Sequence, residues 1–267
     1  MAAWVMVSAS VLGGAIGSFL NVCIDRLPRG QSIVDPPSHC PDCGKPLQFV
    51  DLIPVFSYLW LRGRCRYCGA RIPVRVLAVE AGTAVVFALL ALGYGAGIEF
   101  LMLAYYFSLL LLLAVIDLEQ GIIPNRIVYP GLAVGLITAP LWAVTDFARP
   151  FFWGGPGMVA ALLSSVSGGI VLFAIFFGIV LASRGGMGWG DVKMAALVGL
   201  AVGFSGLPAA FLTAVLSGGL VAAFLLAARR KGRKDAIPFG PFLALGGMVA
   251  LLWGKEFTLW YFRLVGL

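Results

Sequence analysis

Charged residues are scarce in this chain. They make up 12% of its 267 residues, whereas hydrophobic residues make up 61%, and the mean hydropathy is +0.99. This scarcity excludes an ordinary soluble domain and indicates a protein that crosses a membrane several times. Lys and Arg are absent before Arg26. The basic start of a cleaved signal peptide is therefore missing, and we expect the first apolar segment to stay in place as an anchor.

Neither a repeat of fixed period nor a low-complexity tract occurs in the chain, and its apolar runs lack the alternation of barrel strands. Each run is long enough, or nearly so, for a spanning helix of about 20 residues. We therefore predict an all-α integral membrane protein with about eight transmembrane helices, since a helix satisfies its own backbone groups in lipid. The runs lie at residues 4–24, 76–97, 98–116, 127–145, 157–182, 192–206, 208–228 and 237–254.

The placement of Lys and Arg predicts an orientation. With the N-terminus outside, the inside loops hold sixteen of the 19 Lys and Arg residues, and a bias of this kind marks the cytoplasmic side. We attribute the net charge of +7 to these loops, with anionic lipid headgroups and not nucleic acid as their partners. The predicted parts are a first transmembrane helix (1–24), a cytoplasmic module (25–75) and a membrane core (76–267).

Four of the five cysteines lie in the module at 25–75, as two C-x-x-C pairs with 21 residues between the inner cysteines. The pairs predict a structural zinc site with four thiolate ligands. Two disulfides, an iron–sulfur cluster and metal-free redox thiols are the alternatives. We expect His39 to be solvated and Cys23 to be a small buried residue. The predicted ligands are Cys40, Cys43, Cys65 and Cys68.

Two aspartates lie at the edges of apolar runs, where a carboxylate costs about 2.5–3.5 kcal/mol to insert. Asp117 ends one run, and Asp191 follows the glycine-rich loop 184–190. The predicted orientation puts both at one membrane face, where two close carboxylates share a proton and can direct water onto an amide. The alternative for each is a helix cap or a boundary charge, and Asp191 suits an N-cap position.

Other residues near the two acids are assigned supporting roles. Pro124 and Asn125 form the turn after Asp117, while Gly188 and Gly190 form the loop before Asp191. We expect Lys193 to face elsewhere and meet lipid headgroups. Separate from these, Gly13, Gly14 and Gly17 predict close helix packing. For Glu80, a polar cavity and a hydrogen bond between helices are equally consistent with the sequence.

Together these motifs resemble the bacterial type IV prepilin leader peptidases, membrane aspartic proteases of the Gly-x-Gly-Asp kind. Gly188–Lys193 resembles the second aspartate motif of that family, and Asp117 with Ile123–Asn125 resembles the first. Gly17–Val22 and Arg26–Pro28 resemble its N-terminal signature. The paired C-x-x-C loop is similar to that of the bifunctional members.

The resemblance implies that Asp117 and Asp191 are catalytic, at the cytoplasmic face of the bacterial inner membrane. The implied reaction is removal of the basic leader of prepilins or type II secretion pseudopilins after a glycine. In bifunctional members, N-methylation with S-adenosylmethionine follows, but no cofactor fingerprint shows where the methyl donor would bind. Two functions of other classes stay open. These are an ion- or proton-coupled transporter that uses intramembrane acids, and a zinc-stapled assembly subunit without catalysis.

Overall fold

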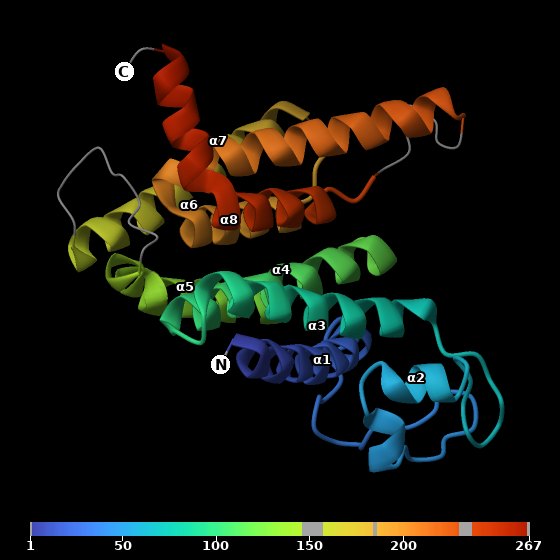
Figure 1. Cartoon of the computed structure of the whole chain (residues 1–267). Helices are drawn as coiled ribbons and strands as arrows, with labels where there is room; N and C mark the ends of the chain where they lie inside the picture. Colours follow the sequence, from blue (N-terminus) through green and yellow to red (C-terminus); the bar gives the residue numbers. More distant parts are fainter. Residues whose placement is uncertain (1, 146–156, 184–185, 230–236, 266–267) are drawn as a thin grey trace. The chain divides into compact units, whose positions relative to one another are not determined.

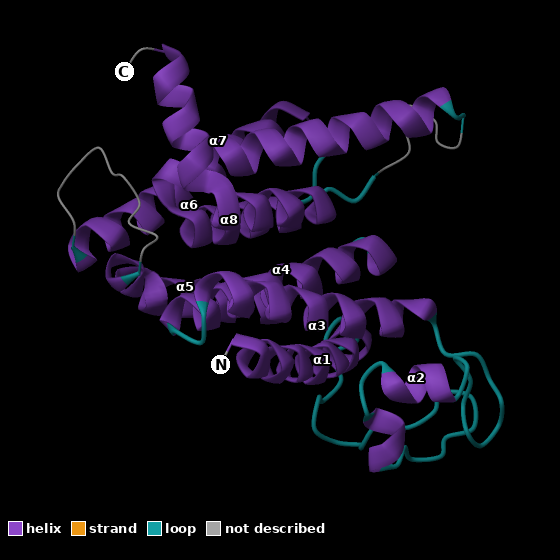
Figure 2. Ribbon diagram, viewed as in Figure 1, coloured by secondary structure: helices purple, strands orange, loops and turns teal. Residues whose placement is uncertain are grey.

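A computed structural model describes residues 2–145, 157–183, 186–229 and 237–265 (Figure 1). These residues form α-helices and short 3-10 helices, with two isolated β-bridges and no strand among them (Figure 2). Part of what the sequence analysis used lies outside these ranges, namely residues 184 and 185 of the glycine-rich loop and, among the counted Lys and Arg, Arg149 and the basic residues of 230–236. The chain divides into two compact units, Met1–Ser108 and Leu109–Leu267, so that the boundary falls within α4 (Ile98–Gln120).

The first unit contains α1 (Ala2–Arg26) and α3 (Val74–Tyr94), which pack closely together. Added β-carbons on Gly13 and Gly17 would overlap the backbone or side chain of Thr83, so the predicted packing role of these glycines is confirmed. Asn21 donates from Nδ2 to the carbonyl of Val76 at 3.1 Å.

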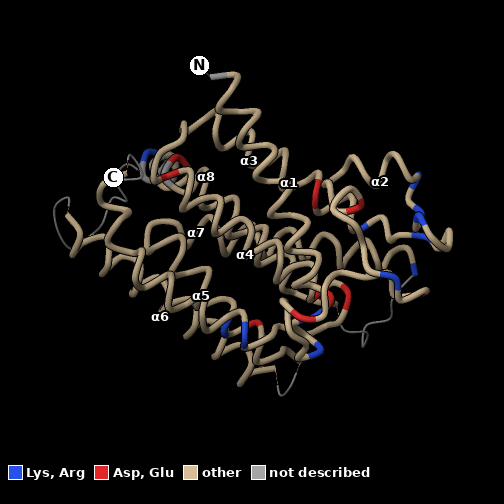
Figure 3. Tube along the Cα trace, turned by 90° about the horizontal axis from the view of Figure 1, so that it is seen from below, with Lys and Arg blue, Asp and Glu red and all other residues tan. Residues whose placement is uncertain are grey.

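Between α1 and α3 the chain forms a loop-rich module that holds η1 (Phe49–Leu52) and α2 (Phe56–Trp60). Lys and Arg residues gather around α2 (Figure 3), as expected of a segment outside the apolar runs. Asp25 and Arg75, near the module ends of α1 and α3, form an ion pair at 2.8 Å. This pair marks the level at which charge begins on both helices.

The second unit contains the end of α4 and the remaining helices, packed through small residues. An added β-carbon on Gly199 would overlap the backbone of Gly168, which shows how closely α6 and α7 approach. The other elements of the second unit are α5 (Asn125–Thr138), η2 (Ala139–Val144), α6 (Met158–Ser183), α7 (Trp189–Ala227) and α8 (Gly240–Val265).

Six helices of the described part are long and apolar enough to cross a membrane, which makes the chain an all-helical, multi-pass membrane protein. The count differs from the predicted eight at two places. Runs 192–206 and 208–228 both belong to α7, and the apolar part of α8, Gly240–Gly254, is shorter than a spanning helix.

Gly203 interrupts α7, with φ of 68° and ψ of 176°. Val198 and Ala210 lie on either side of this break, and both contact one turn of α8, at the neighbouring residues Gly247 and Gly246. In a straight helix Val198 and Ala210 would be about 18 Å apart along the axis. The chain therefore turns back at Gly203, which produces two arms from one stretch of α7.

Candidate active site and thiol cluster

Asp117 lies on the last turn of α4 and is 5% exposed. Its Oδ2 accepts a hydrogen bond of 2.9 Å from the N–H of Gly240, the first residue of α8. A negative charge is unfavourable at the C-terminal end of its own helix, but the N-terminus of a second helix offers unpaired N–H groups and a favourable dipole. The start of α8 therefore explains how this carboxylate is held at a buried position.

Gly240 is a site residue that the sequence analysis missed. A β-carbon there would lie 2.7 Å from Oδ2 of Asp117 and 3.1 Å from its Cγ. The available signal was the sequence Pro238-Phe239-Gly240-Pro241, because a proline in the first turn marks a helix start. The signal predicts where α8 begins, but it does not indicate which side chain its N-terminus meets.

Gly240→Ala is expected to lower kcat for the peptide hydrolysis predicted from the sequence about 10²-fold, because the methyl group displaces the Asp117 carboxylate and small misplacements of a catalytic group have effects of this size. Cleavage of a peptide substrate at saturating concentration measures the change in kcat. Gly219→Ala is the matched control, since a β-carbon at Gly219 meets no atom within 4 Å. Equal rates for both variants would remove Gly240 from the site.

Asp191 is half-buried in the first turn of α7, where Gly188 is the N-cap. Its carboxylate accepts a hydrogen bond from the N–H of Gly188 and interacts electrostatically with Asp117. Asp191 is thus the third residue of the helix and reaches back to the cap, so the N-cap position considered for it is wrong. A β-carbon on Gly188 would lie 3.5 Å from its Oδ2, so glycine leaves room beside the acid.

The segments that carry the two acids also contact each other directly. A β-carbon on Gly190 would lie 2.9 Å from Cβ of Ile123, in the turn after Asp117. Lys193 donates from Nζ to Oδ1 of Asn125 at 2.8 Å, and its ammonium lies 5.7 Å from the ring centre of Tyr129. Lys193 therefore does not face away as expected. It ties the first turn of α7 to the start of α5, where Pro124 is the N-cap.

Glu80 is, besides Asp117 and Asp191, a third acid of an apolar run. It belongs to the first unit and is buried in α3. Its Oε2 accepts a hydrogen bond of 2.8 Å from the N–H of Val55, at the start of α2. The contact with Val55, in the backbone of the module, was not among the alternatives from the sequence. The predicted hydrogen bond between helices is also present, because the Glu80 carboxyl pairs with the side chain of Ser18 in α1.

The four cysteines of the two C-x-x-C pairs form one cluster, with all their sulfurs within 4.8 Å of one another. The two pairs have matching backbones. The N–H of Gly44 donates to the carbonyl of Cys40 at 2.9 Å, and that of Gly69 donates to Cys65 at 3.0 Å. Both glycines have a positive φ, 68° and 73°, which glycine adopts without strain.

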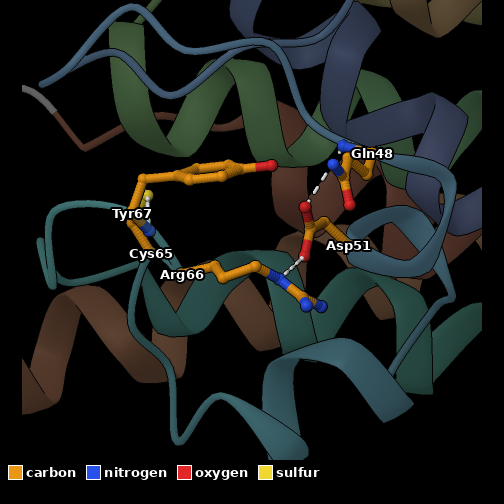
Figure 4. Close-up of polar contacts among 5 residues, drawn as sticks. All are labelled: Gln48, Asp51, Cys65, Arg66 and Tyr67. Carbon is orange, nitrogen blue, oxygen red and sulfur yellow. Dashed lines mark hydrogen bonds and ion pairs between the residues drawn. The ribbon is translucent and has the colours of Figure 1, made fainter.

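Contacts outside the sulfurs hold the second pair in place (Figure 4). Arg66 donates from Nε to Oδ1 of Asp51 at 2.7 Å, and the N–H of Gln48 donates to Oδ2 of the same carboxylate at 3.1 Å. The N–H groups of Cys68 and Tyr67 donate to the Cys65 sulfur and lower the pKa of this thiol to about 7. Cys65 is therefore the thiol of this pair that ionises more readily, since desolvation and the neighbouring cysteines raise the pKa of Cys68. His39 contacts the carbonyl of Pro37 at 3.0 Å and is outside the cluster, and Cys23 is buried as expected.

Comparison with known proteins covers nearly the whole chain. Residues 11–94 match the model of the bacterial peptidase A24 N-terminal domain, and residues 103–223 match that of the type IV leader peptidase family. A prepilin leader peptidase/N-methyltransferase of Pseudomonas putida is 35% identical over 99% of this chain and 96% of its own length. Proteins of the same name from Aeromonas hydrophila and Bacillus subtilis (strain 168) are 33% and 32% identical, over 92% and 95% of this chain and 90% and 96% of their own lengths. No solved structure matches the chain.

Proposed function

Because the chain belongs to the type IV leader peptidase family, we propose that it is an aspartic endopeptidase that removes the basic leader of type IV prepilins or type II secretion pseudopilins. One observation carries the proposal. Asp117, in the last turn of α4, is held by the first N–H of α8, and Asp191 lies in the first turn of α7. The segments that carry the two acids contact each other at Gly190 and Ile123, and the two carboxyls interact electrostatically. The substrate would be held by packing of its apolar helix among the spans, with the cleaved bond after a glycine at the membrane face.

In the proposed reaction, water attacks the carbonyl carbon of the peptide bond. One of the two aspartates takes a proton from the water, and the other, protonated, gives its proton to the carbonyl oxygen. When the tetrahedral intermediate collapses, the C–N bond breaks and the leaving amine takes the proton that the first aspartate received from water. A hydroxyl of the intermediate returns its proton to the other aspartate as the new carboxyl group forms. The two carboxyls regain a single shared proton, so Asp117 and Asp191 act and titrate as a pair.

We further propose that the new N-terminal amine, usually of Phe, is then methylated. The relatives carry N-methyltransferase in their name, which supports this second activity. S-adenosylmethionine would supply the methyl group from its sulfonium, and the amine would lose a proton. We assign no residue of this chain to the methyl donor.

Zinc is the metal that we propose for the thiol cluster. A tetrahedral zinc with Zn–S bonds of about 2.3 Å places its sulfurs about 3.8 Å apart, and the Cys40 and Cys68 sulfurs are 3.8 Å apart. Four thiolates leave no open position for a substrate, so the metal would stabilise the module and not take part in cleavage.

For the membrane arrangement, we propose eight spans in the bacterial inner membrane, with the two arms of α7 and the apolar part of α8 each crossing it. The reversal at Gly203 and the excess of Lys and Arg in alternate loops support this topology. The parts would then be a first helix (1–24), a cytoplasmic zinc module (25–75) and a peptidase core (76–267), with the active site facing the cytoplasm.

The direct test is incubation of the purified full chain with a synthetic prepilin, with and without S-adenosylmethionine. Mass spectrometry of the products should show loss of the leader in both reactions and one added methyl group only with the donor. An intact substrate under conditions in which the protein stays folded would refute the peptidase.

Lys193 is expected to act as a positioning residue. Lys193→Met keeps the length of the side chain but removes the donor to Asn125, so kcat should fall about tenfold, the usual size for a lost hydrogen bond to a charged group. KM should stay unchanged. The readout is a double-mutant cycle with Asn125→Ala. If the bond orients the two motifs, the double variant is no slower than Lys193→Met alone, whereas multiplied losses would show that the two residues act independently.

A further inference from the structure

The segment Phe49–Trp60, which includes η1 and α2, exposes an unusual number of large apolar side chains. Phe49 is 84% exposed and Trp60 is 73% exposed, and Phe56 stacks on Trp60 at a centroid distance of 5.9 Å without either becoming buried. Aromatic side chains of this size are normally buried or bound to a partner. We call these side chains the aromatic patch, which consists of Phe49, Val50, Leu52, Phe56, Leu59 and Trp60.

The patch belongs to a segment that packs alongside α1 and α3 rather than beyond their ends. A β-carbon on Gly14 would lie 3.3 Å from Pro54, and the N–H of Val55 binds Glu80. Gly14 and Glu80 are eleven and five residues from the ion pair of Asp25 and Arg75. At 1.5 Å per residue, the Pro54–Val55 turn lies about 8–16 Å past the level at which charge begins on the two helices.

Backbone at that depth needs a polar partner, because irregular segments are tolerated in the apolar region only where protein groups satisfy them. The backbone of Val55 has such a polar partner. It has φ of 64°, a conformation that strains a β-branched residue, and its N–H ends at the buried Glu80 carboxylate. The hydrogen bond between Glu80, inside the apolar helix α3, and Val55, on the loop, thus holds the Pro54–Val55 turn at a fixed depth.

We propose that the aromatic patch inserts into the lipid leaflet at the Arg26 end of α1, as an interfacial anchor held in place by Glu80. Amphipathic segments of this kind bury their apolar side about 5–10 Å into the boundary between headgroups and acyl chains, which agrees with the depth of the turn. Arg62 and Arg64, both exposed just after the patch, suit the phosphates of anionic lipids. The partner is therefore phospholipid. The apolar helix of a protein substrate is the other occupant that the experiment must distinguish.

Photo-crosslinking tests the proposal on the full chain in nanodiscs of phosphatidylethanolamine and phosphatidylglycerol. The crosslinker p-benzoylphenylalanine replaces Phe49 or Trp60, and in the control it replaces Asp42, which is exposed between two cysteines. We expect lipid adducts at positions 49 and 60 to exceed those at 42 by at least about fivefold, as for an inserted segment. Equal adducts at all three positions would overturn the proposal. So would adducts at 49 and 60 that form with an added synthetic prepilin and not with lipid.

Substitutions at Glu80 test the holding contact. Glu80→Gln keeps an oxygen that can accept the N–H of Val55, whereas Glu80→Leu has none. Lipid adducts at position 60 should be retained in the first variant and fall at least about threefold in the second, because the unpaired N–H no longer fixes the turn. Bound zinc, measured in both, reports whether the module stays folded. A folded Glu80→Leu protein with unchanged adducts would show that the anchor does not depend on Glu80.

Discussion

Asp117→Asn and Asp191→Asn are each expected to reduce leader cleavage by at least about 10³-fold, in the range lost when a general acid or base is removed. Asparagine keeps the shape of the side chain and can still accept a hydrogen bond from Gly240 or Gly188. It can neither take a proton from water nor carry the shared one. Single-turnover cleavage of a synthetic prepilin, followed by mass, measures the loss.

Glu119→Gln provides the matched control, since Glu119 is exposed on α4 two residues beyond Asp117. Its cleavage rate should equal that of the unmodified protein, and all three variants should elute as folded protein. Cleavage retained in either aspartate variant would remove that residue from the mechanism. A transporter that used these acids would instead show ion flux in liposomes and no proteolysis.

Removal of the proposed metal is expected to unfold the module between α1 and α3. The double variant Cys65→Ser/Cys68→Ser should lower bound zinc from about one ion per chain to near zero, because four-thiolate sites bind with about 10–16 kcal/mol and two ligands cannot sustain that affinity. The module, which has few buried side chains of its own, should then become sensitive to protease between α1 and α3. Metal analysis and limited proteolysis measure the two outcomes.

Cys23→Ala is the matched control for this variant, because Cys23 is buried in α1 and lies outside the cluster. It should bind as much zinc as the unmodified protein. A double variant that still binds one zinc per chain would show that the proposed ligands are wrong. If protease resistance survived without metal, the metal would not be what stabilises the module.

The features predicted best from the sequence are those encoded over short distances. Cys40 and Cys43 are three residues apart and turn on a glycine, so their spacing alone indicates a metal knuckle, and the second pair repeats it. Asp191 follows a glycine loop at the start of an apolar run, which places it on the first turn of a helix. The all-helical fold follows from the length and hydropathy of the runs.

Contacts between distant segments could not be predicted in this way. Gly240 is 123 residues from Asp117 in the chain, and the sequence around each residue does not indicate that the two are in contact. The contact between Glu80 and Val55 could not be predicted either, because an isolated acid in an apolar run has many possible partners. The break that was predicted between runs 192–206 and 208–228 lies instead at Gly203, inside the first of these runs, because one residue with positive φ suffices to redirect a helix.

The hydrogen bond from Gly240 to Asp117 has a consequence for how the enzyme is made. The ribosome completes α4 long before it reaches residue 240, so a nascent chain holds Asp117 without the donor that orients it. The proposed pair of carboxyls can be assembled only once the last helix has left the translocation machinery. Release of the polypeptide after Asp191 but before α8 would then leave a membrane-inserted protein that has both acids and lacks the donor that orients Asp117.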